Sequence, residues 1–207
     1  MQHEKCCYCE IKIPLHGHLK AVEHFRPKSI YKNLTNDWGN LLLACAQCNG
    51  KKSDKFPLKL TNNEKEAKVI HTKYNSQKKK TRKAILIDPS KEDPEKYLDF
   101  VIDQKEKETY GLIIAKDNNR RGKITIEIVG LYDSYYLNNH RDFMRDSLIP
   151  TFSMMVSAKD HNNCDKFSSS KQQFETWMDK TYKLSALTRA FVRYYKLDKD
   201  YKIQIPS

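Results

Sequence analysis

The sequence predicts an α+β fold, in which a small metal-stapled unit is followed by a mainly α-helical region. Two Cys-x-x-Cys pairs lie within the first 50 residues, and this spacing lets both sulfurs of one turn face a single ion. Two short apolar runs, at residues 19–25 and 41–43, have the length of strands. Residues 168–197 contain no Gly or Pro and repeat large apolar side chains every three or four positions, which is the period of a helix.

The elements of the N-terminal unit follow from local patterns. Residues 19–25 alternate loosely between apolar and polar and predict a strand that ends before Pro27. Residues 41–43 predict a second strand. The polar stretch at 49–54 is compatible with a short helix that stops before Pro57. Strand, loop, strand and helix are the order of a ββα-metal finger.

We expect this finger to occupy residues 1–60. A unit of this size buries too little apolar surface to be stable without its metal. Residues 61–83 are highly charged, end in the run KKKTRK and predict a basic connector. Residues 84–207 predict an α-rich accessory domain that binds a partner.

The accessory region contains four predicted elements. Residues 98–103 and 109–116 predict a β-hairpin. Residues 124–131 fit both a β-branched strand and one face of a helix. Residues 138–149 predict a helix that Pro150 breaks or kinks. Residues 168–197 predict one long helix, with serines ahead of it to cap its N-terminus.

Positive charge is concentrated in the first 83 residues. They carry 18 Lys and Arg against seven Asp and Glu, whereas residues 84–207 carry 20 against 19. A basic excess beside a metal cluster predicts binding to a phosphate backbone, with solubility as the simpler alternative. No apolar run is long enough to span a bilayer, and the N-terminus has no signal core, so we expect a cytoplasmic protein without membrane contact.

Four of the six cysteines form a predicted structural zinc site. Structural zinc takes four ligands in a tetrahedron, commonly from two Cys-x-x-Cys turns. Cys7 is separated from Cys9 by only one residue, so it makes a poorer partner. In a reducing compartment, thiolate ligands are favoured over disulfides. The predicted ligands are Cys6, Cys9, Cys45 and Cys48.

Glu, His and Asn side chains lie between and beside the cysteine pairs. Hydrolysis of a phosphodiester needs a base that deprotonates water and a divalent ion that neutralises charge on the phosphate and the leaving oxygen. A neutral imidazole at His24 suits the first role near pH 7. Glu23, together with the amide of Asn49 or Asn40, offers hard oxygen ligands for Mg²⁺ or a similar ion. Glu23 and His24 are strand neighbours that point to opposite faces in ideal geometry, so a twist or bulge is required.

In chain order these motifs read Cys-x-x-Cys, Glu-His, Asn-Leu and Cys-x-x-Cys-Asn-x-x-Lys. This order resembles the HNH endonuclease superfamily, in its ββα-metal subgroup with a structural zinc. The resemblance is specific over residues 6–58. A looser resemblance over residues 84–131, through LIDPSKEDPEKYLDF and EIVGLY, is to the HNH partners of ATPases in Septu and some retron anti-phage systems.

The resemblance implies a role for each polar residue of the cluster. His24 would be the general base, and Asn40 would order the loop that carries it. Glu23 and Asn49 would hold the catalytic divalent ion, although the superfamily most often has Asp where this chain has Glu23. The resemblance also implies that residues 124–131 are helical, that the setting is bacterial, and that the accessory region docks on a PtuA-like ATPase.

Four basic residues flank the cluster and are candidates for contacts with a nucleic-acid backbone: Arg26, Lys28, Lys51 and Lys52. DNA is the favoured substrate. Three alternatives stay open: an RNase that uses the same site, for example on tRNA; a zinc-stapled nucleic-acid-binding module without catalysis; and an interaction protein whose finger only folds it. Parallel cleavage assays on DNA and RNA, a His24→Ala variant and the salt dependence of binding distinguish them.

Overall fold

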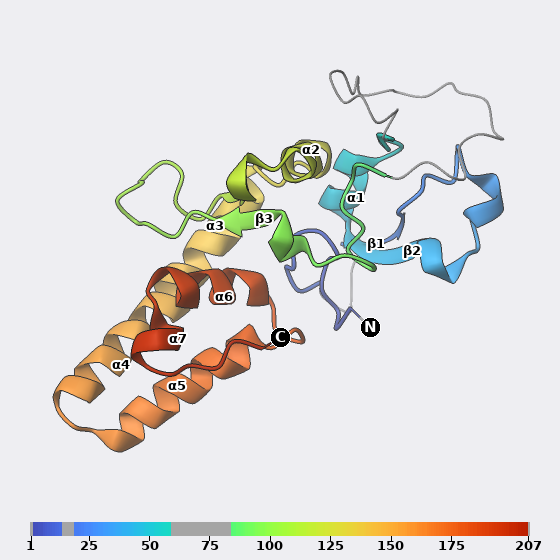
Figure 1. Cartoon of the computed structure of the whole chain (residues 1–207). Coiled ribbons are helices and arrows are strands. Elements are labelled where there is room, and N and C mark those ends of the chain that lie inside the picture. The colour runs from blue at the N-terminus through green and yellow to red at the C-terminus, as the bar shows by residue number, and fades with distance from the viewer. Residues whose placement is uncertain (1, 14–18, 59–83, 207) are drawn as a thin grey trace.

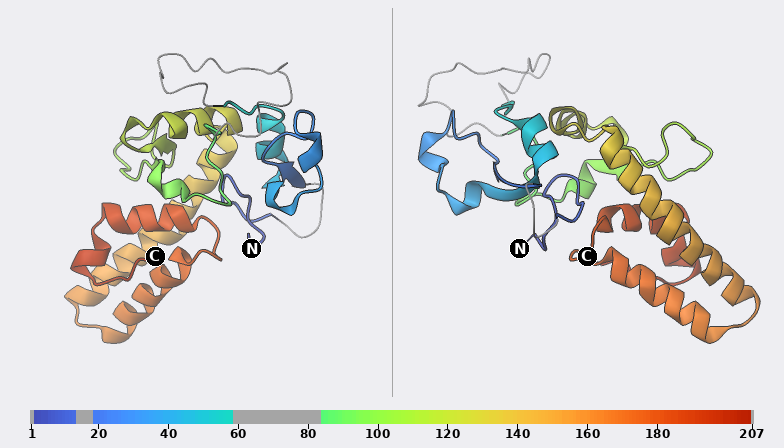
Figure 2. Two further views of the ribbon diagram at one scale, coloured as in Figure 1. Left: turned by 45° about the vertical axis from the view of Figure 1, so that its right-hand side comes forward. Right: turned by 180° about the vertical axis from the view of Figure 1, so that it is seen from behind.

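The computed structural model describes residues 2–13, 19–58 and 84–206, and it confirms the predicted α+β class. The N-terminal unit and the C-terminal helices lie at opposite ends of the molecule, with a second, smaller hairpin and helix α2 between them (Figures 1 and 2). The predicted basic connector at 61–83 lies outside the described residues. Within the described part of the chain, no helix is long and apolar enough to cross a membrane.

The N-terminal unit has the predicted order of strand, loop, strand and helix. Strand β1 (Lys20–His24) pairs antiparallel with β2 (Leu41–Cys45), and helix α1 (Ala46–Lys52) follows directly. The helix begins earlier than predicted because Cys45 caps it: its Sγ accepts a hydrogen bond from the backbone N–H of Cys48 at 3.4 Å. Cys48 and Asn49 therefore lie on α1 rather than ahead of it.

The structure contains the predicted hairpin, and it shows that the ambiguous segment after the hairpin is helical. Strands β3 (Leu98–Phe100) and β4 (Ile113–Ala115) pair antiparallel, over shorter spans than predicted. The ambiguous segment is helical, as part of α2 (Arg120–Val129). The side chain of Asn119 caps the start of α2, and Gly130, at φ 71°, ends it in the left-handed region that glycine adopts without strain.

The predicted break at Pro150 does not occur: the helical path continues through a π-helical turn that lies just ahead of the proline. Helix α3 (Ser134–Phe143) runs through a π-helical turn (Met144–Leu148) into α4 (Ile149–Asp160). In the wide turn the N–H of Ile149 donates to the carbonyl of Met144, five residues back. Pro150 lacks an N–H and stands in the first turn of α4, where none is needed, so the helical path continues.

The single helix predicted at 168–197 is wrong: two helices and a turn occupy this region. Helix α5 (Cys164–Met178) ends at Asp179, and α6 (Ser185–Tyr194) begins after Leu184, which has a left-handed φ of 52°. The three-to-four-residue spacing of apolar side chains continues across the turn because both helices pack against the same core. Local sequence did not reveal the turn, since the partner that stabilises it is Glu10, which accepts a hydrogen bond from the backbone N–H of Leu184 at 3.3 Å through its carbonyl.

Two hydrophobic cores hold the molecule together. The first takes side chains from the predicted nuclease unit and from residues 84–136 of the predicted accessory region, among them Phe25, Leu42, Phe56, Leu86, Val129 and Tyr136. The second lies among the C-terminal helices, which end with α7 (Leu197–Asp200), and includes Phe143, Phe174, Met178, Leu187 and Phe191. Residues after the connector therefore help to build the core beneath the cysteine pairs.

Candidate metal centre and active site

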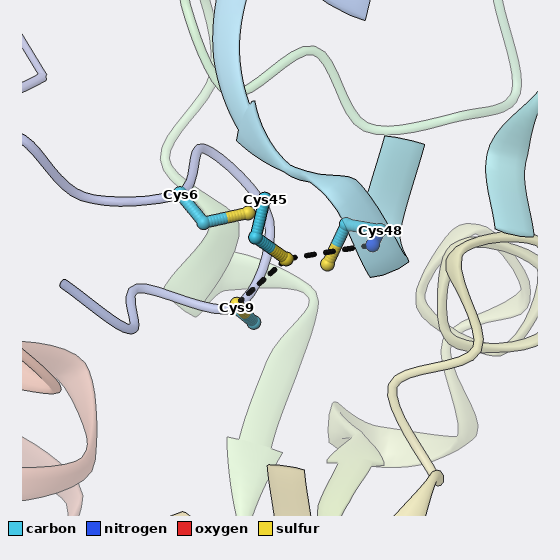
Figure 3. Close-up of side chains that lie close together, drawn as sticks. All are labelled: Cys6, Cys9, Cys45 and Cys48. Carbon is cyan, nitrogen blue, oxygen red and sulfur yellow. Dashed lines mark hydrogen bonds between the residues drawn. The ribbon is translucent and has the colours of Figure 1, made fainter. Parts of the chain in front are cut away.

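The four predicted metal ligands converge on one point (Figure 3). Their Sγ atoms all lie within 4.8 Å of one another, and those of Cys9 and Cys45 are 4.0 Å apart. A tetrahedral ion with bonds of about 2.3 Å holds its sulfurs about 3.8 Å apart, so the cluster has the size of a metal site. All four thiols are free, and the set consists of Cys6, Cys9, Cys45 and Cys48.

Local structure explains why these sulfurs meet. Cys6 and Cys9 lie on a tight turn whose ends are joined by hydrogen bonds between Cys6 and residues 10 and 11. The N–H of Cys7 donates to the carbonyl of Leu43 at 3.0 Å, which docks this turn against β2. Cys45 ends β2 and Cys48 lies one turn into α1. Hydrogen bonds from Cys45, Cys48 and the other neighbouring thiols lower the pKa of Cys6 strongly, which favours a thiolate there.

Tyr136 of α3 contacts the metal cluster from outside. Its hydroxyl lies 3.2 Å from Cys48 Sγ, and both residues are fully buried. Burial raises the pKa of Tyr136, so the phenol keeps its proton and can donate it to the sulfur when Cys48 is a metal-bound thiolate. Beside this contact, the ammonium of Lys51 lies 3.5 Å from the Asp133 carboxylate, just ahead of α3. Sequence reasoning missed Tyr136, because 88 residues separate it from Cys48 and no motif surrounds it.

Glu23 forms a buried ion pair. Its Oε1 lies 2.5 Å from the ammonium of Lys52 on α1, and the exposed fractions of the two residues are 2% and 0%. The hydroxyl of Tyr8, inside the first cysteine turn, donates to the same oxygen at 3.2 Å. Burial raises the pKa of Glu23, and Lys52 opposes that shift. Lys52 therefore differs from its predicted place: it neutralises Glu23 inside the protein and is not a surface contact for a phosphate.

His24 is held in one tautomer. Its Nε2 lies 3.0 Å from the backbone carbonyl of Thr35, and because a carbonyl only accepts, Nε2 carries the proton of the neutral ring. Nδ1 then keeps its lone pair. Along β1, Glu23 is buried while His24 is only partly buried, so the neighbours point to opposite faces, as regular strand geometry requires.

Asn40 closes the loop that contacts His24. Its Oδ1 accepts from the N–H of Arg26 at 2.7 Å, and its Nδ2 donates to the carbonyls of Arg26 and Leu34 at 3.0 and 3.2 Å. Asn40 is 4% exposed, so these bonds satisfy a buried amide. We call residues 26–40 the braced loop. Because Thr35 belongs to it, Asn40 fixes the segment that orients His24.

The remaining predicted site residues differ in how far they are buried and in what they contact. Asn49 is partly buried on α1, one turn before Lys52. The guanidinium of Arg26 lies over the rings of Tyr31 and Phe56, at 5.2 and 5.1 Å from their centres, and its Nη1 is buried without a hydrogen bond. Lys28 is exposed.

Glu23 and Asn49 offer oxygen atoms, which are the type of ligand that a hard divalent cation prefers. Mg²⁺ commonly takes one or two protein carboxylates, and waters and substrate phosphates complete its coordination. In this structure, however, Lys52 supplies the positive charge at the Glu23 carboxylate. Apart from the four cysteines, no group of three His, Cys, Asp or Glu side chains gathers as metal ligands among residues 2–13, 19–58 and 84–206. A cation at Glu23 would have to share the carboxylate with Lys52.

Comparison with known proteins shows which family the N-terminal unit resembles. Residues 6–55 match the family model described as HNH endonuclease. The match spans both cysteine pairs, Glu23, His24, Asn40 and Asn49.

The curated proteins that this chain resembles in sequence include Septu proteins. The chain is 48% identical over 52 residues to the Septu protein PtuB of Bacillus thuringiensis, covering 25% of this chain and 20% of that protein. It is 28% identical over 146 residues to PtuB of Bacillus mycoides (strain KBAB4), covering 64% and 44%. The Septu protein PtuA of the same strain is 27% identical over 139 residues, covering 61% and 17%. The chain thus spans less than half of each relative. No solved structure matches.

Proposed function

We propose that this protein is a metal-dependent endonuclease that hydrolyses phosphodiester bonds, with His24 as the general base. The observation that carries the proposal is the orientation of His24 within an HNH domain: Nε2–H is bound to the Thr35 carbonyl, and the lone pair of Nδ1 is left to accept a proton from water. The buried Asn40 holds the braced loop in place, which keeps this tautomer and ring orientation.

Zinc suits the cysteine cluster. Four cysteine sulfurs within 4.8 Å of one another, three of them on buried residues, are typical of a structural zinc site, which has no open position for a substrate. The cluster supports the candidate active site from two sides. Tyr8 lies in the first cysteine turn, and Lys52 lies on the helix that begins at the second pair; both contact Glu23.

Glu23 and Asn49 are assigned as oxygen ligands of a catalytic divalent ion, Mg²⁺ or a similar one. When bound, such an ion neutralises charge on the scissile phosphate and stabilises the leaving oxygen. Lys52 and Tyr8 hold the Glu23 carboxylate on the inner face of β1, opposite His24, and an ion bound at Glu23 would share that carboxylate with Lys52. DNA is the favoured substrate, and RNA cleavage by the same site is the alternative. The similarity to the Septu proteins PtuB and PtuA supports a role in a Septu anti-phage system. Docking of residues 84–207 on a PtuA-like ATPase is part of the same proposal.

A cleavage assay tests the proposal. Labelled DNA and RNA are incubated in parallel with the full chain, with Mg²⁺ or with EDTA, and with and without the ATPase. We expect cleavage that needs the divalent ion, and we expect His24→Ala to reduce its rate by roughly 10²–10⁴-fold, the usual contribution of a general base. His161→Ala is the matched control, since His161 is exposed and far along the chain. Full activity of His24→Ala would overturn the assignment of the base.

A further inference from the structure

Trp38 is the most exposed large apolar side chain in the described part of the molecule. Its exposed fraction is 87%, against 66% for Val22, the next highest. The other tryptophan, Trp177, is 9% exposed and packs against Phe143 and Phe174 in the second core. Single exposed apolar residues are common on proteins. The significance of Trp38 therefore depends on how it is held and where it stands.

The backbone around Trp38 is fixed on both sides. Asp37 Oδ1 accepts a hydrogen bond from the N–H of Gly39 at 2.8 Å, and the N–H of Asn40 donates to the Asp37 carbonyl at 2.8 Å. The N–H of Leu41, at the start of β2, donates to the carbonyl of Trp38 itself. No aromatic ring among the described residues packs on the Trp38 ring. The indole is thus presented to solvent on a rigid turn.

Trp38 lies close to the proposed general base. It belongs to the braced loop, three residues after Thr35, whose carbonyl contacts His24 at 3.0 Å. Three residues of chain span at most about 11 Å, so the backbone of Trp38 lies within that distance of Thr35. The braced loop lies on the far side of the β1–β2 hairpin from the C-terminal helices (Figures 1 and 2).

The charge around Trp38 suits a phosphate backbone. Lys28 and Lys32 are exposed on the same loop. Its single acidic residue, Asp37, is engaged with the Gly39 N–H. Exposed aromatic rings beside basic residues are how proteins bind single-stranded nucleic acid, because each unstacked base offers a ring face and each phosphate a negative charge. Bases within a duplex are already stacked on their neighbours and cannot cover the indole without unpairing.

We infer that Trp38 is a stacking platform for an unpaired base of a nucleic acid bound along the braced loop, whose Thr35 carbonyl orients His24. The preferred substrate is then single-stranded or locally opened nucleic acid. This inference rests on the proposed function, but its test does not depend on cleavage. The intrinsic fluorescence of Trp38 reports directly on stacking, because Trp177 is buried and the chain has no other tryptophan.

The experiment uses the full-length His24→Ala protein, which we expect to bind nucleic acid while cleaving it only slowly. A short single-stranded oligonucleotide should quench its tryptophan fluorescence, and the matching blunt duplex at the same concentration should not. Adding Trp38→Ala should remove the quenching and weaken single-strand binding roughly 5- to 150-fold, measured by anisotropy of a labelled strand. Trp38→Phe should retain more affinity than Trp38→Ala. Tyr194→Ala, an exposed aromatic on α6, should change neither readout.

Three results would overturn the inference: equal quenching by the duplex, unchanged affinity in Trp38→Ala, or unchanged nucleic-acid binding together with loss of co-purification with the ATPase. The last result would make Trp38 a protein contact. Failure of the proposed function itself would be seen separately, as absence of cleavage by the wild-type chain in the assay described above.

Discussion

Glu23 stands where the HNH superfamily that this sequence resembles most often has Asp, and the contacts around it explain how the longer side chain is accommodated. Its carboxylate is buried and reaches across to α1, where Lys52 lies 2.5 Å away. Tyr8 donates to the same oxygen. A buried carboxylate without a partner is strongly unfavourable, so Lys52 and Glu23 depend on each other.

Replacing Lys52 alone should therefore destabilise the fold. We expect Lys52→Met to lower the free energy of unfolding by about 3–5 kcal/mol, because it leaves the buried Glu23 charge unpaired. Adding Glu23→Gln to that variant should recover most of the loss. Urea unfolding of the metal-loaded protein measures both. Lys51→Met is the control: its pair with Asp133 is half exposed, so it should cost less than about 1 kcal/mol. Similar losses in Lys51→Met and Lys52→Met would disprove a special role for the buried pair.

At the scale of elements, patterns that depend on near neighbours were predictable from sequence and contacts between distant segments were not. The cysteine pairs, both strands of the first hairpin and the second hairpin follow from local spacing and alternation. The turn at 179–184 does not, because it is stabilised by Glu10, whose carboxylate accepts from the N–H of Ala186 at 2.9 Å. The helix continues past Pro150 because a π-helical turn precedes it, and the amino-acid composition of this segment does not indicate such a turn.

The candidate site follows the same division. His24, Asn40 and the cysteines were predictable as a set because they lie within 43 residues in a recognisable order. The burial of Lys52 was not predictable, because a lysine that follows a cysteine pair is expected at the surface. Only the structure shows that its partner, Glu23, lies on the inner face of β1. The contact of Tyr136 with the metal cluster was not predictable for a similar reason: the sulfur that it contacts belongs to another element.

The contact between α3 and the metal cluster has a measurable consequence. Tyr136→Phe removes the hydroxyl that donates to Cys48 Sγ while keeping the ring in the first core. Loss of such a hydrogen bond to a metal ligand typically costs 10–100-fold in metal affinity. We expect metal transfer to a chromophoric chelator to be easier by about that factor. Tyr135→Phe is the control, because Tyr135 is 42% exposed. Equal metal retention in both variants would rule out the proposed coupling.

At the scale of the whole molecule, the N-terminal unit is joined to the helices at several points. Tyr136 contacts the metal cluster, Lys51 pairs with Asp133, and Glu10 caps the start of α6. Lys5, which is 7% exposed, lies 3.1 Å from the Glu10 carboxylate and adds to the last contact. Loading of the metal site should therefore stabilise more than the finger, because the helices dock on the same cysteine turns.

His140 provides a test of the junction between the second hairpin and the helices. It lies on α3, is 1% exposed, and packs edge-on against Phe100 of β3. Its Nδ1 lies 2.8 Å from the Gly111 carbonyl, so Nδ1 carries the proton of the neutral ring. Its Nε2 is buried without a hydrogen-bond partner. Protonation would place an N–H and a positive charge where nothing accepts them, and burial accordingly lowers the pKa of His140 from 6.5 to about 4.

Stability should therefore fall in mild acid. Because the unfolded chain binds this proton more tightly, the contribution of neutral His140 is complete above about pH 6.5 and is lost as the pH falls towards 4, for a total of about 3 kcal/mol. Urea unfolding at several pH values between about 7 and 5 should show this slope in the wild type and a flatter one in His140→Leu. His161→Leu, at an exposed site, should keep the wild-type slope. Since acid also weakens metal binding by the cysteines, the comparison is between variants at each pH, and identical slopes in all three proteins would exclude His140 as the source.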